Sequence, residues 1–172
     1  MTPAHRQLLL GQAIGSVFCN LPLNAWLAWV TFPPVDALPV FARGNCVAGD
    51  TVGTSFFLPL ITCLILTTIT RRLLRGGKVA PLRRADLPAA IRFWPASFVG
   101  RGALVGLICA LTIAWVALAV VAGLGVESMT RLQMAVYKGV YTVVLGLIVT
   151  PLFGWRALAD AAPASSPTAS LP

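Results

Sequence analysis

The stretch ALVGLICALTIAWVALAVV, residues 103–121, contains no charged side chain and a single hydroxyl group, that of Thr112. A helix needs about 20 mostly apolar residues to cross the hydrocarbon core of a membrane. With its flanking residues, the stretch therefore predicts a membrane-spanning helix over residues 102–124. The sequence GLG at residues 123–125 is a typical stop for such a helix.

Three other stretches have the length and apolar character of a span, and the composition of the whole chain agrees with them. Of its 172 residues, 58% are hydrophobic and 10% are charged, whereas soluble domains usually carry about 25% charged residues. We therefore expect an all-α, polytopic membrane protein, with four transmembrane helices in a small bundle (residues 1–156) and a disordered tail rich in Ala, Pro and Ser (residues 157–172). The expected spans are residues 8–32, 51–70, 102–124 and 132–153.

The basic residues predict how the chain lies in the membrane, because Lys and Arg near span ends are retained in the cytoplasm. Eight of the 13 Lys and Arg residues fall in the loop 71–101, and Arg6 and Arg156 belong to the same side. The other side has only Arg43 and Arg131. We therefore expect both termini and the basic loop to be cytoplasmic, and we expect the location to be a bacterial inner membrane.

A cleaved signal peptide is the competing interpretation of the first span. The apolar run is long for a signal peptide, only Arg6 marks a charged start, and no A-x-A cleavage site follows it. We therefore expect this segment to remain in the protein as a membrane span.

The basic loop 71–101 has two possible uses. Basic residues close to a membrane are attracted to anionic lipid headgroups, each contributing about 1 kcal/mol, and binding of nucleic acid or of a cytoplasmic protein is the alternative. No recognisable nucleic-acid-binding module accompanies the arginines, so we expect the lipid bilayer as the partner and no nucleic acid. The residues expected to contact anionic headgroups are Arg71, Arg72, Arg75, Lys78, Arg83 and Arg84.

The first span carries an unusual polar pattern around the sequence FCNLPLNAW, residues 18–26. Pro22 deprives the carbonyl of Phe18 of its usual donor, and a nearby amide can replace that donor. We expect this kink to face the bundle interior, with its polar residues either joining helices or lining a site. Gly11 and Gly15 permit the close approach of another helix. Four polar residues recur every four positions, a spacing that places them along one face of a helix: Gln12, Ser16, Asn20 and Asn24.

Two charged residues accompany the second and fourth spans. Asp50 begins the second span, where an aspartate is a preferred N-cap, and Lys138 lies about 9–10 Å inside the fourth. A lysine at such a depth either extends to the membrane surface or marks a functional site. Because the first span runs outward and the other two run inward, their polar residues share the outer half of the membrane. We hypothesise an outward-facing polar pocket, with Asp50 and Lys138 paired or nearly so, lined by Asn20, Asn24, Asp50, Thr54, Tyr137, Lys138 and Tyr141.

The side chains that usually perform catalysis are missing from the sequence. His5 is the only histidine, the five acidic residues are scattered, and the four cysteines have no CxxC or other metal-like spacing. Cys46 is the one thiol that we expect to be exposed, in the outer loop. We therefore expect the protein not to be an enzyme and to use no cofactor and no metal.

In size and number of spans, the chain resembles the small multidrug-resistance transporters, whose four helices work as dimers. Those proteins use a membrane-embedded glutamate in the first helix for proton coupling, and the first span here has no glutamate. No residue role is therefore carried over. We expect a small permease or transport-related protein, which with four spans implies a homo-oligomer or a membrane partner. The alternative is a non-catalytic scaffold or accessory subunit of a larger membrane complex.

Overall fold

The computed structural model describes residues 3–32, 34, 37–82, 87 and 89–160. Four helical segments in these parts are long and apolar enough to cross a membrane. This indicates a multi-pass membrane protein and confirms the prediction of a helical chain with four candidate spans. In chain order, the elements are α1 (Pro3–Thr31), β1 (Leu38–Pro39), α2 (Val47–Arg75), α3 (Ala89–Arg92), α4 (Phe98–Leu111), α5 (Ile113–Gly123), β2 (Ser128–Met129) and α6 (Arg131–Asp160).

The helices extend beyond the apolar stretches that predicted them. α1 starts at Pro3, and proline is well suited to the first position of a helix. α2 ends with Arg75, a basic residue that complements the negative end of the helix. α6 continues to Asp160, so residues 157–160 of the expected disordered tail are helical. Residues 161–172 lie outside the described residues.

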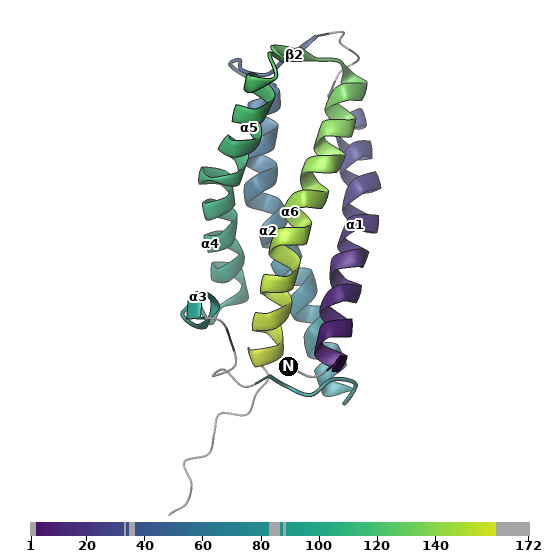
Figure 1. The fold of residues 1–172 in the computed structure, drawn as a ribbon, viewed down its shortest axis with the longest axis vertical. Coiled ribbons are helices and arrows are strands. Elements are labelled where there is room, and N and C mark those ends of the chain that lie inside the picture. Colours follow the sequence, from purple (N-terminus) through teal and green to yellow (C-terminus); the bar gives the residue numbers. More distant parts are fainter. Residues whose placement is uncertain (1–2, 33, 35–36, 83–86, 88, 161–172) are drawn as a thin grey trace, which may run out of the picture.

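The third span is divided at one residue. α4 ends and α5 begins at Thr112, whose backbone angles are φ −125° and ψ −69°. The Thr112 hydroxyl donates to the carbonyl of Ile108 (2.7 Å), a bond by which threonine often bends a helix. Backbone hydrogen bonds continue across the break, from Thr112 to Ile108 and from Val116 to Thr112. α4 and α5 therefore follow one another along a single span (Figure 1).

The helices run alternately in opposite directions and pack unevenly (Figure 1). α2 packs against α4 and α6, whereas α1 packs mainly against α6 and barely touches α2. α1 is consequently the most exposed of the four spans. Its most apolar stretch is 11% buried, and the corresponding stretch of α6 is 61% buried.

Glycines determine how closely α4 approaches α2. A Cβ atom at Gly102 would lie 3.0 Å from the Cα atom of Leu60, and one at Gly106 would overlap the carbonyl of Phe56. Gly102 and Gly106 therefore form a close-packing pair, which lets the backbone of α4 approach α2.

Glycines of α6 likewise determine how closely α1 approaches α6, and the sequence did not predict this contact. A Cβ atom at Gly146 would lie 2.6 Å from the hydroxyl of Ser16, and one at Gly154 would lie 2.6 Å from Oε1 of Gln12. The polar face of α1 therefore lies directly against the glycines of α6 at these two positions.

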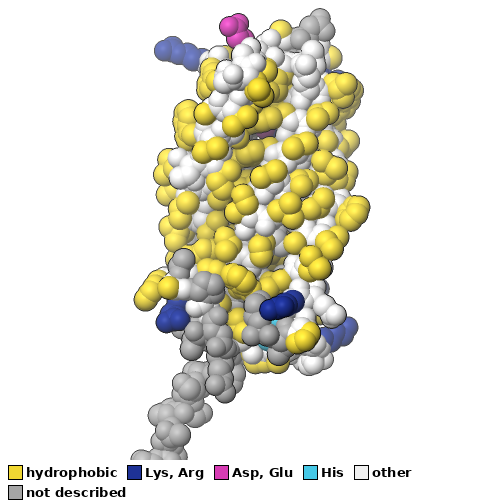
Figure 2. Space-filling model, in the orientation of Figure 1, with side chains coloured by type: hydrophobic (Ala, Val, Ile, Leu, Met, Phe, Trp, Pro, Cys, Tyr) yellow, Lys and Arg dark blue, Asp and Glu magenta, His cyan; other side chains and the backbone are white. Residues whose placement is uncertain are grey.

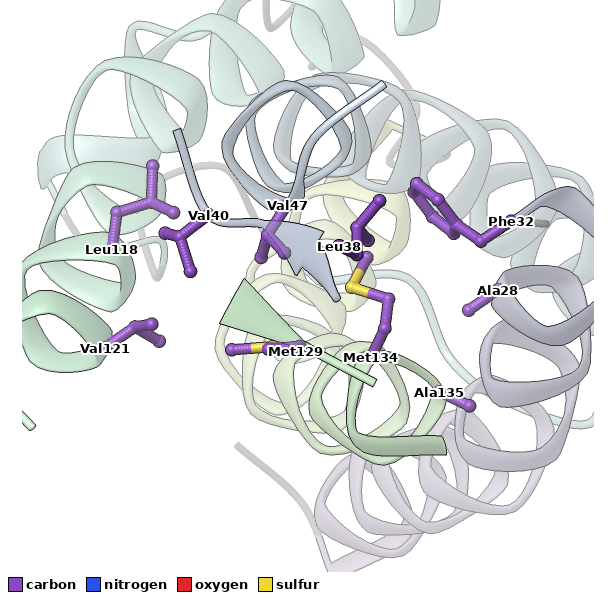
Figure 3. Close-up of a cluster of buried hydrophobic side chains, with 10 residues drawn as sticks. All are labelled: Ala28, Phe32, Leu38, Val40, Val47, Leu118, Val121, Met129, Met134 and Ala135. Carbon is purple, nitrogen blue, oxygen red and sulfur yellow. The ribbon is translucent and has the colours of Figure 1, made fainter. Parts of the chain in front are cut away.

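The end of the molecule that holds β1 and β2 is called the β end below. The two strands form one antiparallel pair, with Leu38 opposite Met129. Their side chains pack with residues of α1, α2, α5 and α6 in an apolar cluster (Figure 3). Arg131 donates to the carbonyl of Trp29 and lies over its ring, 4.3 Å from the centroid, which fastens the end of α1 to the start of α6.

The opposite end, where α1 and α4 begin and α2 and α6 end, is called the basic end below. Arg101, expected as a charge of the cytoplasmic loop, is fully buried and lies 2.7 Å from Oδ2 of Asp160. Arg156 lies 3.0 Å from the other oxygen of the same carboxylate. The three side chains join α4 to the last turn of α6.

The surface between the two ends is apolar. On the face shown in Figure 2, hydrophobic side chains form a broad band, and the charged side chains gather at the ends of the molecule. This distribution suits a protein whose middle lies in hydrocarbon.

Candidate functional site

An ion pair joins α2 to α6 near the β end. Nζ of Lys138 lies 2.6 Å from Oδ1 of Asp50, and the side chains are 5% and 16% exposed. The pairing that the sequence predicted is therefore present, and Lys138 does not extend to the surface. Pairing lowers the cost of holding either charge inside a membrane.

Asp50 does not cap α2, so that prediction was wrong. The helix begins earlier, and its N-cap is Cys46, whose Sγ accepts from the N–H of Gly49 at 3.3 Å. This role also explains why Cys46 is buried and not exposed as expected. Asp50 lies in the first turn, where a carboxylate is favoured by the positive end of the helix.

Hydroxyl groups continue the contact between α2 and α6 below the ion pair. The hydroxyls of Thr51 and Ser55 each donate to a carbonyl one turn earlier in α2. Because each has only one proton, the phenol hydroxyls must donate in the contacts of Tyr137 with Thr51 (3.0 Å) and of Tyr141 with Ser55 (2.5 Å). Tyr137 and Tyr141 therefore serve to join two helices.

The side chains of the two asparagines of α1 bond within their own helix. Asn20 donates to the hydroxyl of Ser16 (2.8 Å), and Asn24 donates to the carbonyl of Asn20 (3.0 Å). Neither amide bonds the carbonyl of Phe18, so the expected repair of the kink is absent. Pro22 itself is exposed, whereas Asn24 is buried, so only the amide side of the kink faces inward.

A groove runs between α1 and α2 because these two helices barely touch. Its half nearer the β end has a volume of about 520 Å³, and its half nearer the basic end has a volume of about 530 Å³. The two halves adjoin each other, since four residues line both, and together they are called the α1–α2 groove. The residues that line both halves are Cys19, Asn20, Thr62 and Ile65.

Residues with polar side chains occur along the whole groove, although most of its exposed surface is apolar. Two of them present buried atoms that have no hydrogen-bond partner among the described residues: Oε1 of Gln12 and Oγ1 of Thr150. Nε2 of Gln12 donates to Thr70 of α2 at 3.2 Å, which links the two helices toward the basic end. The polar residues of the lining include Gln12, Ser16, Asn20, Asn24, Asp50, Thr54, Thr62 and Thr150.

The structure divides the seven residues of the expected pocket into two sets. The first set lines the β-end half of the groove and comprises Asn20, Asn24, Asp50 and Thr54. The second set lies in the contact between α2 and α6 and comprises Tyr137, Lys138 and Tyr141. The bond between Lys138 and Asp50 connects the two sets.

Sequence reasoning missed that the groove continues toward the basic end. Gln12 and Ser16 belong to the polar stripe of the first span, so their face of the helix could have indicated this extension. Thr62 and Thr150 could not, because threonine in a membrane helix commonly bonds its own backbone.

The expected lipid-contact residues lie partly within the described chain. Those described are exposed at the basic end: Arg71, Arg72, Arg75 and Lys78. The guanidinium of Arg71 also lies over the ring of Phe98, 5.8 Å from its centroid. Arg83 and Arg84 lie outside the described residues, and contact with anionic lipid stays a prediction.

Within the described ranges, no group of three His, Cys, Asp or Glu side chains could hold a metal ion. Comparison of the chain with protein-family models, with curated proteins and with solved structures finds no match. The function is therefore inferred from the geometry of the groove and the ion pair.

Proposed function

We propose that the protein is a small permease or transport-related protein of a bacterial inner membrane, and that the β-end half of the α1–α2 groove is its outward-facing substrate site. The observation that carries this proposal is the ion pair of Asp50 and Lys138 between the spans. Ionisable residues at membrane depth are costly and mark substrate or ion pathways by default. Asp50 lines the groove whereas Lys138 lies behind it, so a substrate there meets a carboxylate.

The orientation follows from the distribution of charge. Exposed basic residues flank the basic end, namely Arg71, Arg72, Arg75 and Lys78. Because such residues are retained in the cytoplasm, the proposal places both termini inside and the β end outside. The basic residues would then lie beside the anionic headgroups of the inner leaflet.

The proposed substrate path follows the border between protein and lipid. Between α2 and α6, the hydroxyl groups already bond in pairs, Tyr137 with Thr51 and Tyr141 with Ser55. They therefore offer no hydrogen-bond donor to a substrate. The α1–α2 groove, by contrast, has volume and unpartnered polar atoms. α1 is the least buried span, so a shift of α1 against α6 is the motion that would widen or narrow this path.

A scaffold or accessory subunit is the second candidate, and the glycines of α1 favour it. Gly11 and Gly15 are exposed, and a Cβ atom on either would meet nothing within 4 Å. They pack against no other helix of the described chain, so the small-xxx-small face is open to a helix of a partner or of a second copy.

Reconstituted protein in liposomes tests the permease proposal. The probes are radiolabelled ethanolamine and glycine, as water-soluble solutes, and phospholipids with a fluorescent acyl chain. We expect at least one probe to cross faster than in protein-free liposomes, and we expect Lys138→Met to abolish the difference. Glu127→Gln is the control, because Glu127 is exposed at the β end. If no probe crosses faster with folded protein present, the proposal is wrong.

A further inference from the structure

We infer that the substrate is a phospholipid with a zwitterionic, amine-bearing head, which crosses the membrane along the α1–α2 groove while its acyl chains stay in the bilayer. This inference rests on the proposed transport function and specifies the substrate class. It concerns the whole groove, including the basic-end half that the ion pair does not reach.

The groove is long enough to cross the membrane. Its lining extends on α1 from Gln7 to Leu27 and on α2 from Asp50 to Ile69. At 1.5 Å per residue, both distances are about 30 Å, which is the thickness of the hydrocarbon core. A polar head that stays in the groove therefore remains in contact with the protein while it crosses the membrane.

Polar groups along this path are closely spaced. The four polar residues of α1 stand four positions apart, which corresponds to steps of about 6 Å. Moving a polar group into hydrocarbon without a hydrogen bond is costly, and short steps let the head form a new bond near the one that it leaves. The groups on the facing helix α2 are Asp50, Thr54 and Thr62.

Two buried atoms in the basic-end half lack partners and complement such a head. Thr150 is fully buried and Gln12 is partly buried, and neither the Thr150 hydroxyl nor Oε1 of Gln12 has a partner among the described residues. Buried polar atoms are normally hydrogen-bonded. Both atoms are buried, and Oε1 of Gln12 lies against Gly154 of α6. A shift of α1 against α6 would therefore be needed before Gln12 could accept from an ammonium group and Thr150 could donate to a phosphate oxygen.

The rim of the groove is apolar and open to lipid. The exposed side chains of its lining include Leu23, Leu27, Phe57, Ile61, Ile65 and Ile69. A water-soluble solute would lie against these side chains with no apolar part to cover them. Acyl chains cover them at no such cost, so a molecule with a polar head and apolar chains matches both parts of the groove.

Charge selects among lipid heads. Asp50 is the charged residue of the described lining, and it presents a carboxylate to the groove. Lys138 balances the charge of this carboxylate, so the pair carries no net charge. A zwitterionic head adds no net charge to the site, whereas a head with net negative charge would lie there without a counter-charge. The amine-bearing head of phosphatidylethanolamine therefore fits better than the head of phosphatidylglycerol.

The dimensions also favour a lipid over a helix of a partner. A transmembrane helix with its side chains is about 10–12 Å wide. Each half of the groove offers only about 520 or 530 Å³, a volume in the range typical of small-molecule sites, about 300–1,000 Å³. A helix would therefore lie over the groove instead of filling it.

A fluorescence assay in liposomes tests the inference directly. Phosphatidylethanolamine or phosphatidylglycerol carries a nitrobenzoxadiazole group on one acyl chain, and external dithionite quenches only the outer leaflet. We expect wild-type protein to accelerate exchange between the leaflets above protein-free liposomes, and more for phosphatidylethanolamine than for phosphatidylglycerol.

Glycine variants supply a matched set for this assay. Gly15 and Gly53 line the two halves of the groove, whereas Gly123 lies on α5, and a Cβ atom on any of the three meets nothing within 4 Å. Gly15→Leu and Gly53→Leu should each fill the groove, fold normally and lose the acceleration. Gly123→Leu should retain it.

Threonine variants test the polar path without changing its width. Thr62→Val removes one hydroxyl from the groove, and Thr68→Val removes one from an exposed position of α2 outside it. We expect Thr62→Val to slow the exchange about threefold, the effect of one average hydrogen bond in a membrane. Thr68→Val should exchange lipid as fast as wild type.

Three results would overturn the inference. The first is exchange no faster than in protein-free liposomes, and the second is acceleration that survives both groove-filling variants. The third is efficient crosslinking of Cys19, an exposed groove residue, to its counterpart in a second copy, which would make the groove a dimer interface. If ethanolamine crosses and the lipids do not, only the lipid inference is wrong, whereas failure of all probes overturns the proposed function as well.

Discussion

α1 and α6 are helices of almost equal length, 29 and 30 residues, and each has an internal proline and a row of polar side chains. Their surroundings nevertheless differ. The polar row of α6 bonds to α2 through Tyr137, Lys138 and Tyr141. The amides of Asn20 and Asn24 in α1 bond only within α1. The same pattern in sequence therefore joins two helices at three positions of α6, whereas in α1 it mainly lines a groove and reaches α2 through Gln12.

Glycines show the same contrast. Gly146 and Gly154 of α6 leave no room for a side chain because α1 lies against them, whereas Gly11 and Gly15 of α1 face open space. α6 thus packs against both α1 and α2, whereas α1 is attached to the bundle mainly through α6 and by one face only. Apart from Lys138, whose loss should affect both, substitutions on α6 should mainly change stability, and substitutions on α1 should mainly change function.

The largest expected effect is at the last turn of α6. Asp160→Asn removes the carboxylate from the fully buried Arg101, and leaving one partner of a buried ion pair uncompensated costs about 3–5 kcal/mol. Unfolding in mixed micelles with increasing dodecyl sulfate should show this loss of stability. Glu127→Gln, at an exposed acid, is the control, and equal stability of the two variants would show that the cluster does not hold α6.

The ion pair of α6 with α2 should give the next largest effect. Lys138→Met leaves Asp50 without its cation, and because Asp50 is 16% exposed we expect a loss near the lower limit for buried pairs, about 3 kcal/mol. The double variant Asp50→Asn with Lys138→Met should recover most of this stability in the same unfolding measurement. A double variant that is less stable than either single variant would contradict a role for the pair in stability.

The sequence predicted the features that depend on hydropathy and on depth in the membrane. The four apolar stretches located the spans, and the alternating direction of the spans brought Asp50 and Lys138 to a similar depth. Their pairing could be predicted because an unpaired charge there is costly.

Features that depend on which helices are neighbours could not be predicted. The polar stripe of α1 is compatible with contact to any helix, so the sequence did not show that it lies on α6 and borders a groove toward α2. Arg101 and Asp160 are 59 positions apart, and the Pro and Ser residues after Asp160 favoured a disordered tail. The N-cap was misplaced because an aspartate is a more common cap than the cysteine that is used.

A pair of glycine variants tests whether α6 and α1 differ in packing. Gly154→Leu places a side chain where Leu9 and Gln12 of α1 already lie, and such overpacking costs about 1–3 kcal/mol. Gly15→Leu should not lower the stability, since a Cβ atom at this position meets nothing within 4 Å among the described residues and the rest of the side chain can extend into the groove. The unfolding midpoints of the two variants measure the difference, and a similar loss in both would mean that α1 is packed on both sides.

The variants with the smallest expected effects on stability test whether the polar rows of α6 and α1 have different functions. Tyr141→Phe removes the donor to Ser55 and should lower the stability by about 0.6 kcal/mol, the average for a hydrogen bond between membrane helices. Lipid exchange should not change, because the phenol does not line the groove.

Asn24→Leu should slow lipid exchange and hardly change the stability, the reverse of the effect expected for Tyr141→Phe. The amide of Asn24 bonds a carbonyl of its own helix, and leucine is favoured over asparagine both in helices and in hydrocarbon. We therefore expect the stability to change by no more than about 0.5 kcal/mol, while lipid exchange slows because the groove has lost a polar step beside Asp50. If Asn24→Leu instead lowers stability and leaves exchange intact, the polar row of α1 serves packing, as that of α6 does, and the contrast between the two helices disappears.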